Sequence, residues 1–328
     1  MIADKIAAET PLLKITGLKK YFPIHNGVFS HAVGNLKAVD GVDFEIARGE
    51  TLGLVGESGC GKSTLGYTII RLETPTEGNI FFEDQDIAQI SNQEMIKIRK
   101  NLQIIFQDPY SSLNPRKRVV EILSEPMKVH NTVAKPDIQR EIDRLLDAVG
   151  LPRNCKNRYP HEFSGGQRQR IGIARALSLS PKLIICDEPV SALDVSIQAQ
   201  VLNLLKDLQE EYGLTYLFIS HGLGAIRYIS DRIAVMYLGK IVEIATTEEI
   251  FRNPQHPYTK ALLNAYPVPN PLMREKKRLI IQGDIPNSVN IPSGCRFHTR
   301  CPIAYDKCLI DVPELKGNGH KAACFALG

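Results

Sequence analysis

The stretch Gly56-Glu57-Ser58-Gly59-Cys60-Gly61-Lys62-Ser63 decides the fold of this 328-residue chain. It is a complete phosphate-binding loop, in which glycines let the backbone turn tightly and direct successive N–H groups at phosphate oxygens. Residues 50–55 before it predict a short buried strand, and a helix is expected to begin near Lys62. Because strand, loop and helix come in this order, a chance glycine-rich turn is disfavoured. The chain is expected to hold a nucleoside triphosphate.

The residues of this loop have separate expected tasks. Lys62 supplies a positive charge for the terminal phosphates, and the hydroxyl of Ser63 is expected to bind Mg²⁺. The positive N-terminal end of the following helix adds to the attraction of anions. The ATP-binding residues predicted here are Gly56, Ser58, Gly59, Cys60, Gly61, Lys62, Ser63 and Thr64.

Length and composition limit the possible classes of protein. A chain of 328 residues is long enough for one large core and a smaller attachment. Its net charge is only +4, with acids and bases interspersed, which does not favour a nucleic-acid partner. The sequence has no apolar run of a membrane helix's length, and Met1-Ile2-Ala3-Asp4-Lys5-Ile6 lacks the apolar core of a signal peptide. A cytosolic protein that works at membranes only through a partner is expected.

The residues outside the loop predict an α/β fold. Apolar or alternating runs predict strands at residues 12–18, 38–46, 50–55, 78–83, 102–106, 183–188 and 216–220. Helices are expected at 138–149, where apolar residues recur at helical spacing, and at 197–212. A glycine-containing loop is expected between Phe22 and Ala38. Strands that alternate with helices indicate a parallel sheet covered on both faces.

Two segments interrupt or extend this pattern. Residues from about 108 to 166 change in character and predict a helical insert. Beyond residue 250, prolines such as Pro254 and Pro267 break up the chain and four cysteines appear late, with no internal repeat. The predicted division is a nucleotide-binding domain over residues 1–250 and a C-terminal extension over residues 251–328.

Two adjacent acids are the candidate catalytic pair. Asp187 and Glu188 end an apolar strand and precede Pro189. Asp187 is expected to reach Mg²⁺ directly or through water. Glu188 is expected to polarise the attacking water as a general base. A surface acid pair would not need four apolar residues before it, so the catalytic interpretation is favoured.

A second motif, Phe163-Ser164-Gly165-Gly166-Gln167, lies about a hundred residues after the phosphate loop. With both motifs the chain resembles the ATP-binding cassette (ABC) family over roughly residues 12–250. The resemblance implies an ABC cassette: a parallel-sheet core, an antiparallel β subdomain and a helical insert. In that family Ser164, Gly165, Gly166 and Gln167 would act on ATP held by a partner subunit. The chain therefore looks like half of an ATP-driven clamp.

The resemblance assigns roles to further residues. It implies that Gln107 touches Mg²⁺ or the attacking water and that His221 contacts the γ-phosphate. Tyr21 is expected to stack on the adenine ring, and Phe22, its competitor, to face the core. The family's dimer-contact loop matches Ser191, Leu193 and Asp194. One departure stands out: this chain has Gly222 directly after His221, where the family usually has Asp.

Two further stretches narrow the resemblance. Asp108-Pro109-Tyr110-Ser111-Ser112-Leu113-Asn114-Pro115-Arg116 and Asn253-Pro254-Gln255-His256-Pro257-Tyr258-Thr259-Lys260 are similar to bacterial importers of oligopeptides, dipeptides and nickel. The chain looks most like the second ATPase subunit of the dipeptide type. This implies ATP hydrolysis that drives peptide uptake at the cytoplasmic face of the inner membrane. It also implies a second homologous ATPase subunit, two permeases and an extracytoplasmic solute-binding protein.

Other functions stay open at this point. Nickel, haem or another solute would fit the same importer branch. A soluble ABC ATPase that acts on ribosomes or DNA is disfavoured, because such proteins usually fuse two cassettes or carry coiled-coil arms, and this chain has neither. A P-loop kinase would leave the second motif without a purpose.

Seven cysteines fall into two groups. Cys60, Cys155 and Cys186 are expected to pack as small hydrophobes. The other four lie in the proline-rich tail, where a cytosolic location disfavours disulfides and suggests a metal site. They are Cys295, Cys301, Cys308 and Cys324. Their spacing leaves an iron–sulfur cluster, zinc and unligated thiols open; the resemblance implies a structural [4Fe–4S] cluster, with zinc as the alternative.

Overall fold

The computed structural model describes residues 10–26, 31–265, 283 and 286–327. Its internal contacts divide the chain into two compact units. The first unit joins Met1–Leu12, Ile46–Thr51 and Gln89–Ser220, and the second joins Leu13–Glu45, Leu52–Ala88 and His221–Gly328. The expectation for residues 1–6, and that for Pro267, lie outside the described residues. In the part of the chain that the structure describes, no helix has the length and hydropathy to cross a membrane.

Parallel strands form the centre of the first unit. They are β6 (Leu102–Ile105), β7 (Leu183–Asp187) and β8 (Thr215–Ile219). Leu183 of β7 lies opposite Leu102 of β6 on one side and Thr215 of β8 on the other. Every residue of β7 and β8 is buried, as parallel strands covered on both faces require. Beside β8, the carbonyl of Glu50 accepts a hydrogen bond of 2.9 Å from the N–H of Tyr216.

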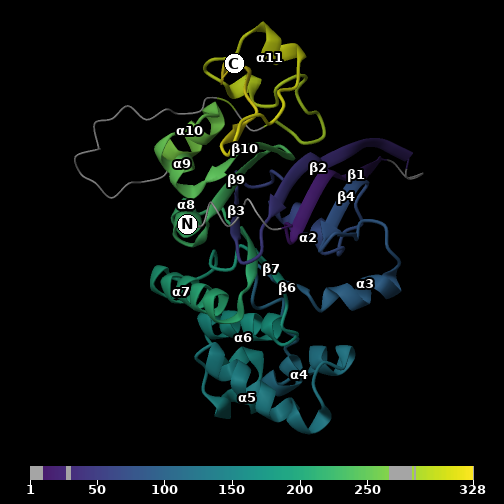
Figure 1. Cartoon of the computed structure of the whole chain (residues 1–328), viewed down its shortest axis with the longest axis vertical. Coiled ribbons are helices and arrows are strands. Elements are labelled where there is room, and N and C mark those ends of the chain that lie inside the picture. The colour runs from purple at the N-terminus through teal and green to yellow at the C-terminus, as the bar shows by residue number, and fades with distance from the viewer. Residues whose placement is uncertain (1–9, 27–30, 266–282, 284–285, 328) are drawn as a thin grey trace, which may run out of the picture. The chain divides into compact units, whose positions relative to one another are not determined.

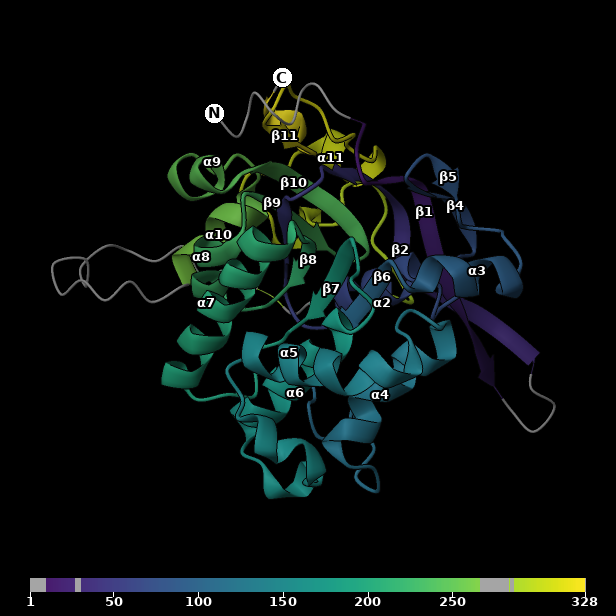
Figure 2. The same cartoon turned by 60° about the horizontal axis from the view of Figure 1, so that its bottom comes forward.

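The helices of the first unit include the predicted insert. The α-helices are α3 (Asn92–Arg99), α4 (Val119–His130), α5 (Ile138–Ala148), α6 (Gly165–Leu177) and α7 (Val195–Tyr212), with short 3₁₀ helices at Lys135–Asp137, Arg153–Asn157 and Pro160–Glu162. Helices α4, α5 and α6 lie together in both views (Figures 1 and 2). Helix α5 buries Ile138, Ile142, Leu145 and Leu146 on one face, so the predicted amphipathic helix is confirmed.

The second unit contains two groups of strands. One is a four-stranded sheet with the order β2 (His31–Ile46), β1 (Leu13–Asn26), β4 (Glu77–Phe82), β5 (Gln85–Asp86). β1 and β4 run antiparallel, with Ile15 opposite Ile80, and Figure 1 shows them side by side with β2. The other group places β3 (Thr51–Val55) parallel to β9 (Arg232–Tyr237), which pairs antiparallel with β10 (Lys240–Thr246). β11 (Lys321–Ala322) closes the far side of β10.

The helices of the second unit are short. They are α2 (Lys62–Ile69), α8 (Leu223–Ile229), α9 (Thr247–Arg252), α10 (Pro257–Ala265) and α11 (Asp306–Ile310), with 3₁₀ helices at His298–Arg300 and Phe325–Leu327. The expected loop between Phe22 and Ala38 is largely strand, because β1 continues to Asn26 and β2 begins at His31. The aromatic and β-branched residues Tyr21, Phe22 and Ile24 favour this extended backbone.

Candidate functional site

The phosphate loop connects β3 to α2 in the second unit. Gly61 is the N-cap of α2 with φ +105°, a backbone conformation that favours glycine, and its carbonyl accepts a 2.9 Å hydrogen bond from the N–H of Leu65. The carbonyl of Cys60 accepts a second bond of 2.9 Å from the N–H of Gly239. The loop is therefore fixed both to its own helix and to the turn after β9.

Two of its glycines approach neighbouring backbone too closely for any side chain. A Cβ atom on Gly56 would lie 2.2 Å from the carbonyl oxygen of Met236. A Cβ atom on Gly61 would lie 2.0 Å from the carbonyl oxygen of Ala38. Glycine is thus required at these two positions by the packing of the loop as well as by its turn. Gly59 also has a positive φ, but a Cβ atom there would meet nothing within 4 Å.

Lys62 lies over the loop. Its side chain is buried, and Nζ donates hydrogen bonds to the carbonyls of Gly56 at 2.8 Å and Glu57 at 3.0 Å. Cys60, beside it, is also buried, and this burial raises the pKa of its thiol in spite of the Lys62 charge. The remaining predicted ATP contacts are exposed or half-buried along the loop and the first turn of α2; they are Ser58, Gly59, Ser63 and Thr64.

Tyr21 lies on β1 with its ring half-buried. Its hydroxyl donates a hydrogen bond to Asp40, and burial together with that carboxylate raises the pKa of the phenol. Lys37 Nζ lies 5.6 Å from the centroid of the Tyr21 ring. Phe22, expected to face the core, is also half-buried, with Lys20 Nζ 4.6 Å from its ring centroid.

His221 is exposed and stands directly before α8. Gly222, the departure from the family pattern, is the N-cap of that helix, and its carbonyl accepts the N–H of Ile226 at 3.2 Å. A glycine cap has no side-chain acceptor, so one hydrogen bond that an aspartate could make at this helix end is not available.

The candidate catalytic residues of the first unit meet at the ends of β6 and β7. Asp187 is fully buried, and Glu188 follows it half-buried. Gln107 Nε2 donates a 3.1 Å hydrogen bond to Glu188 Oε2, and the Ser191 hydroxyl donates to the Glu188 carbonyl at 3.0 Å. The backbone of Glu188 has φ +46°, which is uncommon for a residue with a side chain and recurs at functional sites. Its N–H donates to the carbonyl of Ile219 at 2.9 Å, which holds this turn in place.

The second motif lies at the start of α6. Ser164 is the N-cap: its hydroxyl accepts the N–H of Gln167 at 3.3 Å, and the Gln167 side chain accepts the N–H of Ser164 at 3.0 Å. A Cβ atom on Gly165 would lie 3.5 Å from the Leu193 side chain, an ordinary contact, whereas one on Gly166 would lie 2.5 Å from Ile197. The motif is therefore packed against the predicted dimer-contact loop, whose last residue, Asp194, is the N-cap of α7.

The predicted magnesium ligands have suitable chemistry. Mg²⁺ prefers oxygen ligands, and Ser63, Asp187 and Gln107 offer a hydroxyl, a carboxylate and an amide oxygen. Because Gln107 donates its amide nitrogen to Glu188, its oxygen is the atom left to face a cation. Ser63 belongs to the second unit and the other two residues to the first.

The prediction of a metal centre at the four C-terminal cysteines is wrong. They all lie within the described residues 286–327. No group of three or more His, Cys, Asp or Glu side chains in the described parts of the chain is placed to hold a metal ion. Neither the iron–sulfur cluster nor the alternative zinc site is therefore supported.

The surroundings of these cysteines give the physical reason. The cavity that they line with Phe297 has a volume of about 10 Å³. One water molecule already needs that much space, so a cluster has no room. Burial raises the pKa of the Cys295 thiol to about 11. The N–H of Cys295 donates to the carbonyl of Cys308 at 2.8 Å, so the pair helps to close the backbone of this segment.

The other three cysteines, Cys60, Cys155 and Cys186, are buried as expected. Burial raises the pKa of each thiol, most strongly inside β7 at Cys186. They therefore pack as small apolar side chains.

Sequence reasoning missed three residues of the tail that contact this site. Arg300 forms two hydrogen bonds to the carboxylate of Glu57, at 2.8 and 3.1 Å. Tyr258 accepts a hydrogen bond from the Glu57 N–H, and Arg296 pairs with Asp40. These partners lie about 200 residues or more apart in sequence, and no local pattern signals such contacts.

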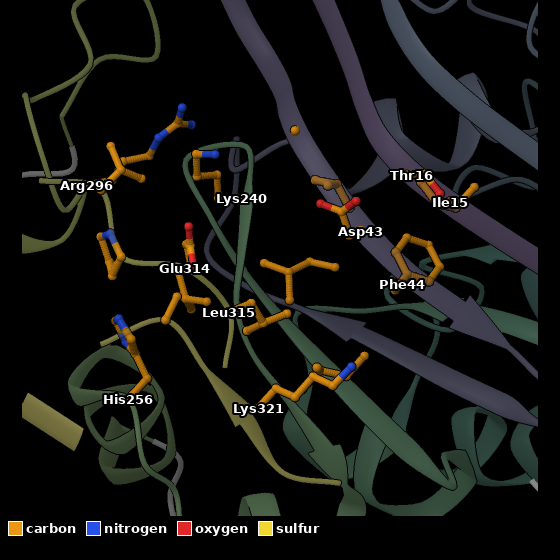
Figure 3. Close-up of a pocket in the computed structure, with 18 of the residues that line it drawn as sticks. Ile15, Thr16, Asp43, Phe44, Lys240, His256, Arg296, Glu314, Leu315 and Lys321 are labelled. Atoms are coloured by element: carbon orange, nitrogen blue, oxygen red, sulfur yellow. The ribbon is translucent and has the colours of Figure 1, made fainter. Parts of the chain in front are cut away.

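A separate cavity of about 750 Å³ lies in the second unit (Figure 3). Its lining includes Lys240, Arg296, Asp43 and Glu314, with apolar walls that include Phe44. None of its lining residues belongs to the phosphate loop. It is therefore distinct from the loop at which phosphates are expected.

The chain is similar to known proteins along nearly its whole length. Residues 39–191 match the family model described as ABC transporter, and residues 242–308 match the one described as Oligopeptide/dipeptide transporter, C-terminal region. The chain is 54% identical to the oligopeptide transport ATP-binding protein AppF of Bacillus subtilis, over 97% of this chain and 98% of that protein. It is 47% identical to the dipeptide transport ATP-binding protein DppF of Haemophilus influenzae, over 99% of each.

Solved structures share its fold. One is the dimeric post-hydrolysis state of the ATP-binding cassette MJ0796 bound to ADP and Pi, with a TM-score of 0.64 and 27% identity, covering 72% of this chain and 98% of that chain. Another is cbiO1 from Clostridium perfringens, part of the transporter complex cbiONQ, with a TM-score of 0.64 and 28% identity over 75% of this chain and 92% of that one.

The loop geometry predicts different costs for two similar substitutions. Gly59→Ala should cost about 1 kcal/mol, the strain of a side chain in the left-handed region. Gly61→Ala adds the collision with the Ala38 carbonyl, so its cost should exceed that of Gly59→Ala and ATP affinity should fall further. Denaturant unfolding of both variants measures the loss of stability, and calorimetric titration with ATP measures the loss of affinity. Equal effects of the two substitutions would contradict the packing argument.

Proposed function

The chain belongs to the ABC transporter family of ATP-binding proteins, and from this premise we propose that it powers an importer of oligopeptides or dipeptides. This proposal rests on the agreement between the full-length relatives and the separate match of the tail. Proteins named as oligopeptide or dipeptide transport ATP-binding proteins are similar to this chain over nearly its full length. The tail separately matches the family model of the C-terminal region of oligopeptide and dipeptide transporters. The cassette fold, a P-loop NTPase with mixed α/β sheets, is the one predicted from the sequence.

The expected assembly follows from this role. ABC importer ATPases act with membrane permeases, and this chain would lie peripherally at the cytoplasmic face beneath two of them. Its other partners would be a second, homologous ATPase subunit and an extracytoplasmic solute-binding protein. We propose two domains for the chain. Residues 1–250 form the ATP-binding domain, with its helical insert near 108–166, and residues 251–328 form a C-terminal extension that carries the four cysteines.

ATP would be held chiefly by the phosphate loop. The N–H groups of the loop and the start of α2 face phosphate oxygens, and Lys62 exchanges its carbonyl partners for the terminal phosphates. Tyr21 presents an aromatic face to the base, and His221 approaches the γ-phosphate. Mg²⁺, when bound, neutralises phosphate charge, and Ser63, Asp187 and Gln107 are the residues that would hold it.

Glu188 is the proposed general base. Its carboxylate is half-buried and accepts a hydrogen bond from Gln107, which fixes its orientation. Its N–H is bound by Ile219, so the unusual backbone conformation persists. A carboxylate held in this orientation can draw a proton from water as that water attacks phosphorus.

The second motif would serve the nucleotide of the partner ATPase. Helix α6 begins at Gly165, and its positive end together with the Ser164 hydroxyl would stabilise a γ-phosphate presented by another subunit. Because Ser164 and Gln167 are exposed, they are available to a second subunit. ATP binding and association of the two ATPases are then thermodynamically linked.

Substitution of the general base should separate binding from hydrolysis. Glu188→Gln should keep ATP affinity and lower the hydrolysis rate of the assembled transporter by roughly two or more orders of magnitude, as for a lost acid–base group. The matched control is Glu210→Gln on the exposed side of α7, which should hydrolyse normally. Near-normal turnover by Glu188→Gln would reject the assignment.

A charge in the second motif should act only across subunits. Gly165→Asp should leave ATP affinity of the isolated chain almost unchanged and abolish ATPase activity of the complex, because the carboxylate repels the partner's nucleotide. Gly165→Ala is the control, since its methyl group makes only an ordinary contact with Leu193. Loss of ATP binding by an intact, isolated Gly165→Asp chain would refute the shared site.

Copurification and transport test the proposal as a whole. The chain isolated in mild detergent from its native cell should carry integral membrane permeases, and vesicles containing that complex should take up labelled dipeptides or oligopeptides when ATP is supplied. Recovery of ribosomes or DNA in place of permeases would favour the soluble alternative. Uptake of nickel or haem but not peptides would retain the importer and replace its solute.

A further inference from the structure

Arg300 lies against the phosphate loop from the far end of the sequence. Its two terminal nitrogens donate to the two oxygens of Glu57 at 2.8 and 3.1 Å, a bidentate pair that fixes geometry as well as charge. The Arg300 side chain is only 7% exposed and that of Glu57 23%, so water screens this pair weakly. The hydrogen bond to Glu57 raises the pKa of the Arg300 guanidinium, which stays charged.

The same loop residue is held a second time through its backbone. The N–H of Glu57 donates to the hydroxyl of Tyr258 at 2.8 Å, and Tyr258 on α10 is fully buried. Its ring packs at 4.7 Å against Tyr237 and at 5.5 Å against Phe297. The carbonyl of Glu57 accepts Lys62, so side chain, N–H and carbonyl of this one residue are all bonded.

Arg296 reaches the base-stacking tyrosine through one intermediate. One of its nitrogens donates to Asp40, whose other oxygen accepts the hydroxyl of Tyr21, and its second nitrogen donates to the carbonyl of Leu238. Burial alone would raise the pKa of Asp40, but the Tyr21 hydrogen bond and the Arg296 charge outweigh it, so the pKa is lowered and Asp40 is a carboxylate. This carboxylate is the acceptor for the Tyr21 hydroxyl.

The two arginines belong to one short turn. Arg300 ends the 3₁₀ helix His298–Arg300, and its N–H donates to the carbonyl of Phe297 at 3.0 Å. Phe297 itself is buried among Tyr237, Tyr258 and His256. Figure 3 shows Arg296 at the rim of the neighbouring cavity, near Lys240. Residues 296–300 therefore present two fixed guanidinium groups, one toward Asp40 and one toward Glu57.

We propose that Arg296 and Arg300 are positioning residues of the nucleotide site, through which the C-terminal segment sets ATP affinity. Arg300 fixes the phosphate loop through Glu57, and Arg296 fixes the base-stacking ring through Asp40. Each arginine holds a residue that shapes the site before ATP arrives, so that less order has to be gained on binding. The inference rests on the proposed use of the phosphate loop and Tyr21 for ATP.

The two contacts act on different parts of ATP, which makes them separable. The loop binds phosphates, so Arg300 should influence any ligand with a triphosphate chain. Tyr21 meets only the base, so Arg296 should influence ATP but not a ligand that lacks adenine. Inorganic tripolyphosphate supplies the triphosphate chain alone and is the discriminating probe.

The test is calorimetric titration of the full-length chain with Mg–ATP and with Mg–tripolyphosphate, which yields Kd and stoichiometry separately. Arg300→Gln should raise the Kd of both probes by a similar factor, roughly two- to thirtyfold, the range of coupling through a contact network. Arg296→Gln should raise the Kd of ATP within that range and leave the Kd of tripolyphosphate unchanged. Arg300→Lys should lie between Arg300→Gln and the unchanged chain, because lysine keeps the charge and loses the bidentate fork.

Two controls exclude a general structural effect. Arg153→Gln removes an exposed bidentate pair with Asp147 on the helical insert and should change neither Kd. In a Glu57→Gln background, Arg300→Gln should have no further effect on Kd, because it acts through that carboxylate.

Several results would overturn the inference. They are an unchanged Kd in both arginine variants, equal loss of both probes in Arg296→Gln, additive effects of Glu57→Gln and Arg300→Gln, or reduced stoichiometry at constant Kd. The assay needs neither permease nor peptide, so failure of the importer proposal would leave its outcome intact.

Discussion

The phosphate loop approaches its neighbouring strands so closely that two carbonyl oxygens decide its shape. The oxygens of Met236 and Ala38 occupy the space that a side chain on Gly56 or Gly61 would need. This contact holds the loop between β2 and β9, and the hydrogen bond from Gly239 to Cys60 fixes it there. The second unit therefore supplies, from β2 and β9, the two carbonyls against which the loop packs.

The tail is part of that unit and not an appendage to it. Tyr258 and Phe297 pack with Tyr237 of β9, and β11 pairs with β10. Glu243 of β10 is fully buried and accepts the N–H groups of Gln255 and His256 and a bond from His320. A buried carboxylate is stable only when it is bonded in this way, so sheet and tail depend on each other.

The sequence allowed most of the fold to be predicted, and the candidate catalytic residues to be proposed, because their signals are local. Residues 50–63 specify strand, loop and helix by their own order, and helix α5 is visible in the spacing of Ile138, Ile142 and Leu145. Asp187 and Glu188 were found because they end an apolar run. For Gln107 the family resemblance implied only contact with Mg²⁺ or the attacking water; its hydrogen bond to Glu188 was not predicted.

The features that could not be predicted depend on the volume of a cavity and on contacts between residues far apart in the sequence. The spacing of the four tail cysteines says nothing about the space between them, and the cavity of about 10 Å³ that they line appears only in three dimensions. Arg300 and Glu57 are 243 positions apart, so neither could be recognised as the other's partner. The extension of β1 to Asn26 was missed because glycine near residues 27 and 34 suggested a loop.

The pairing of β11 with β10 has a consequence for the order in which the chain folds. β10 emerges during synthesis well before Lys321 and Ala322, and His320 meets Glu243 across 77 positions of sequence. Until then one side of β10 carries unpaired backbone groups, and Glu243 lacks one of its partners. Such an open edge can pair with other chains, so the interval is a window for aggregation. A chaperone that covers β10 while the tail is being made would therefore protect the nascent protein from such pairing.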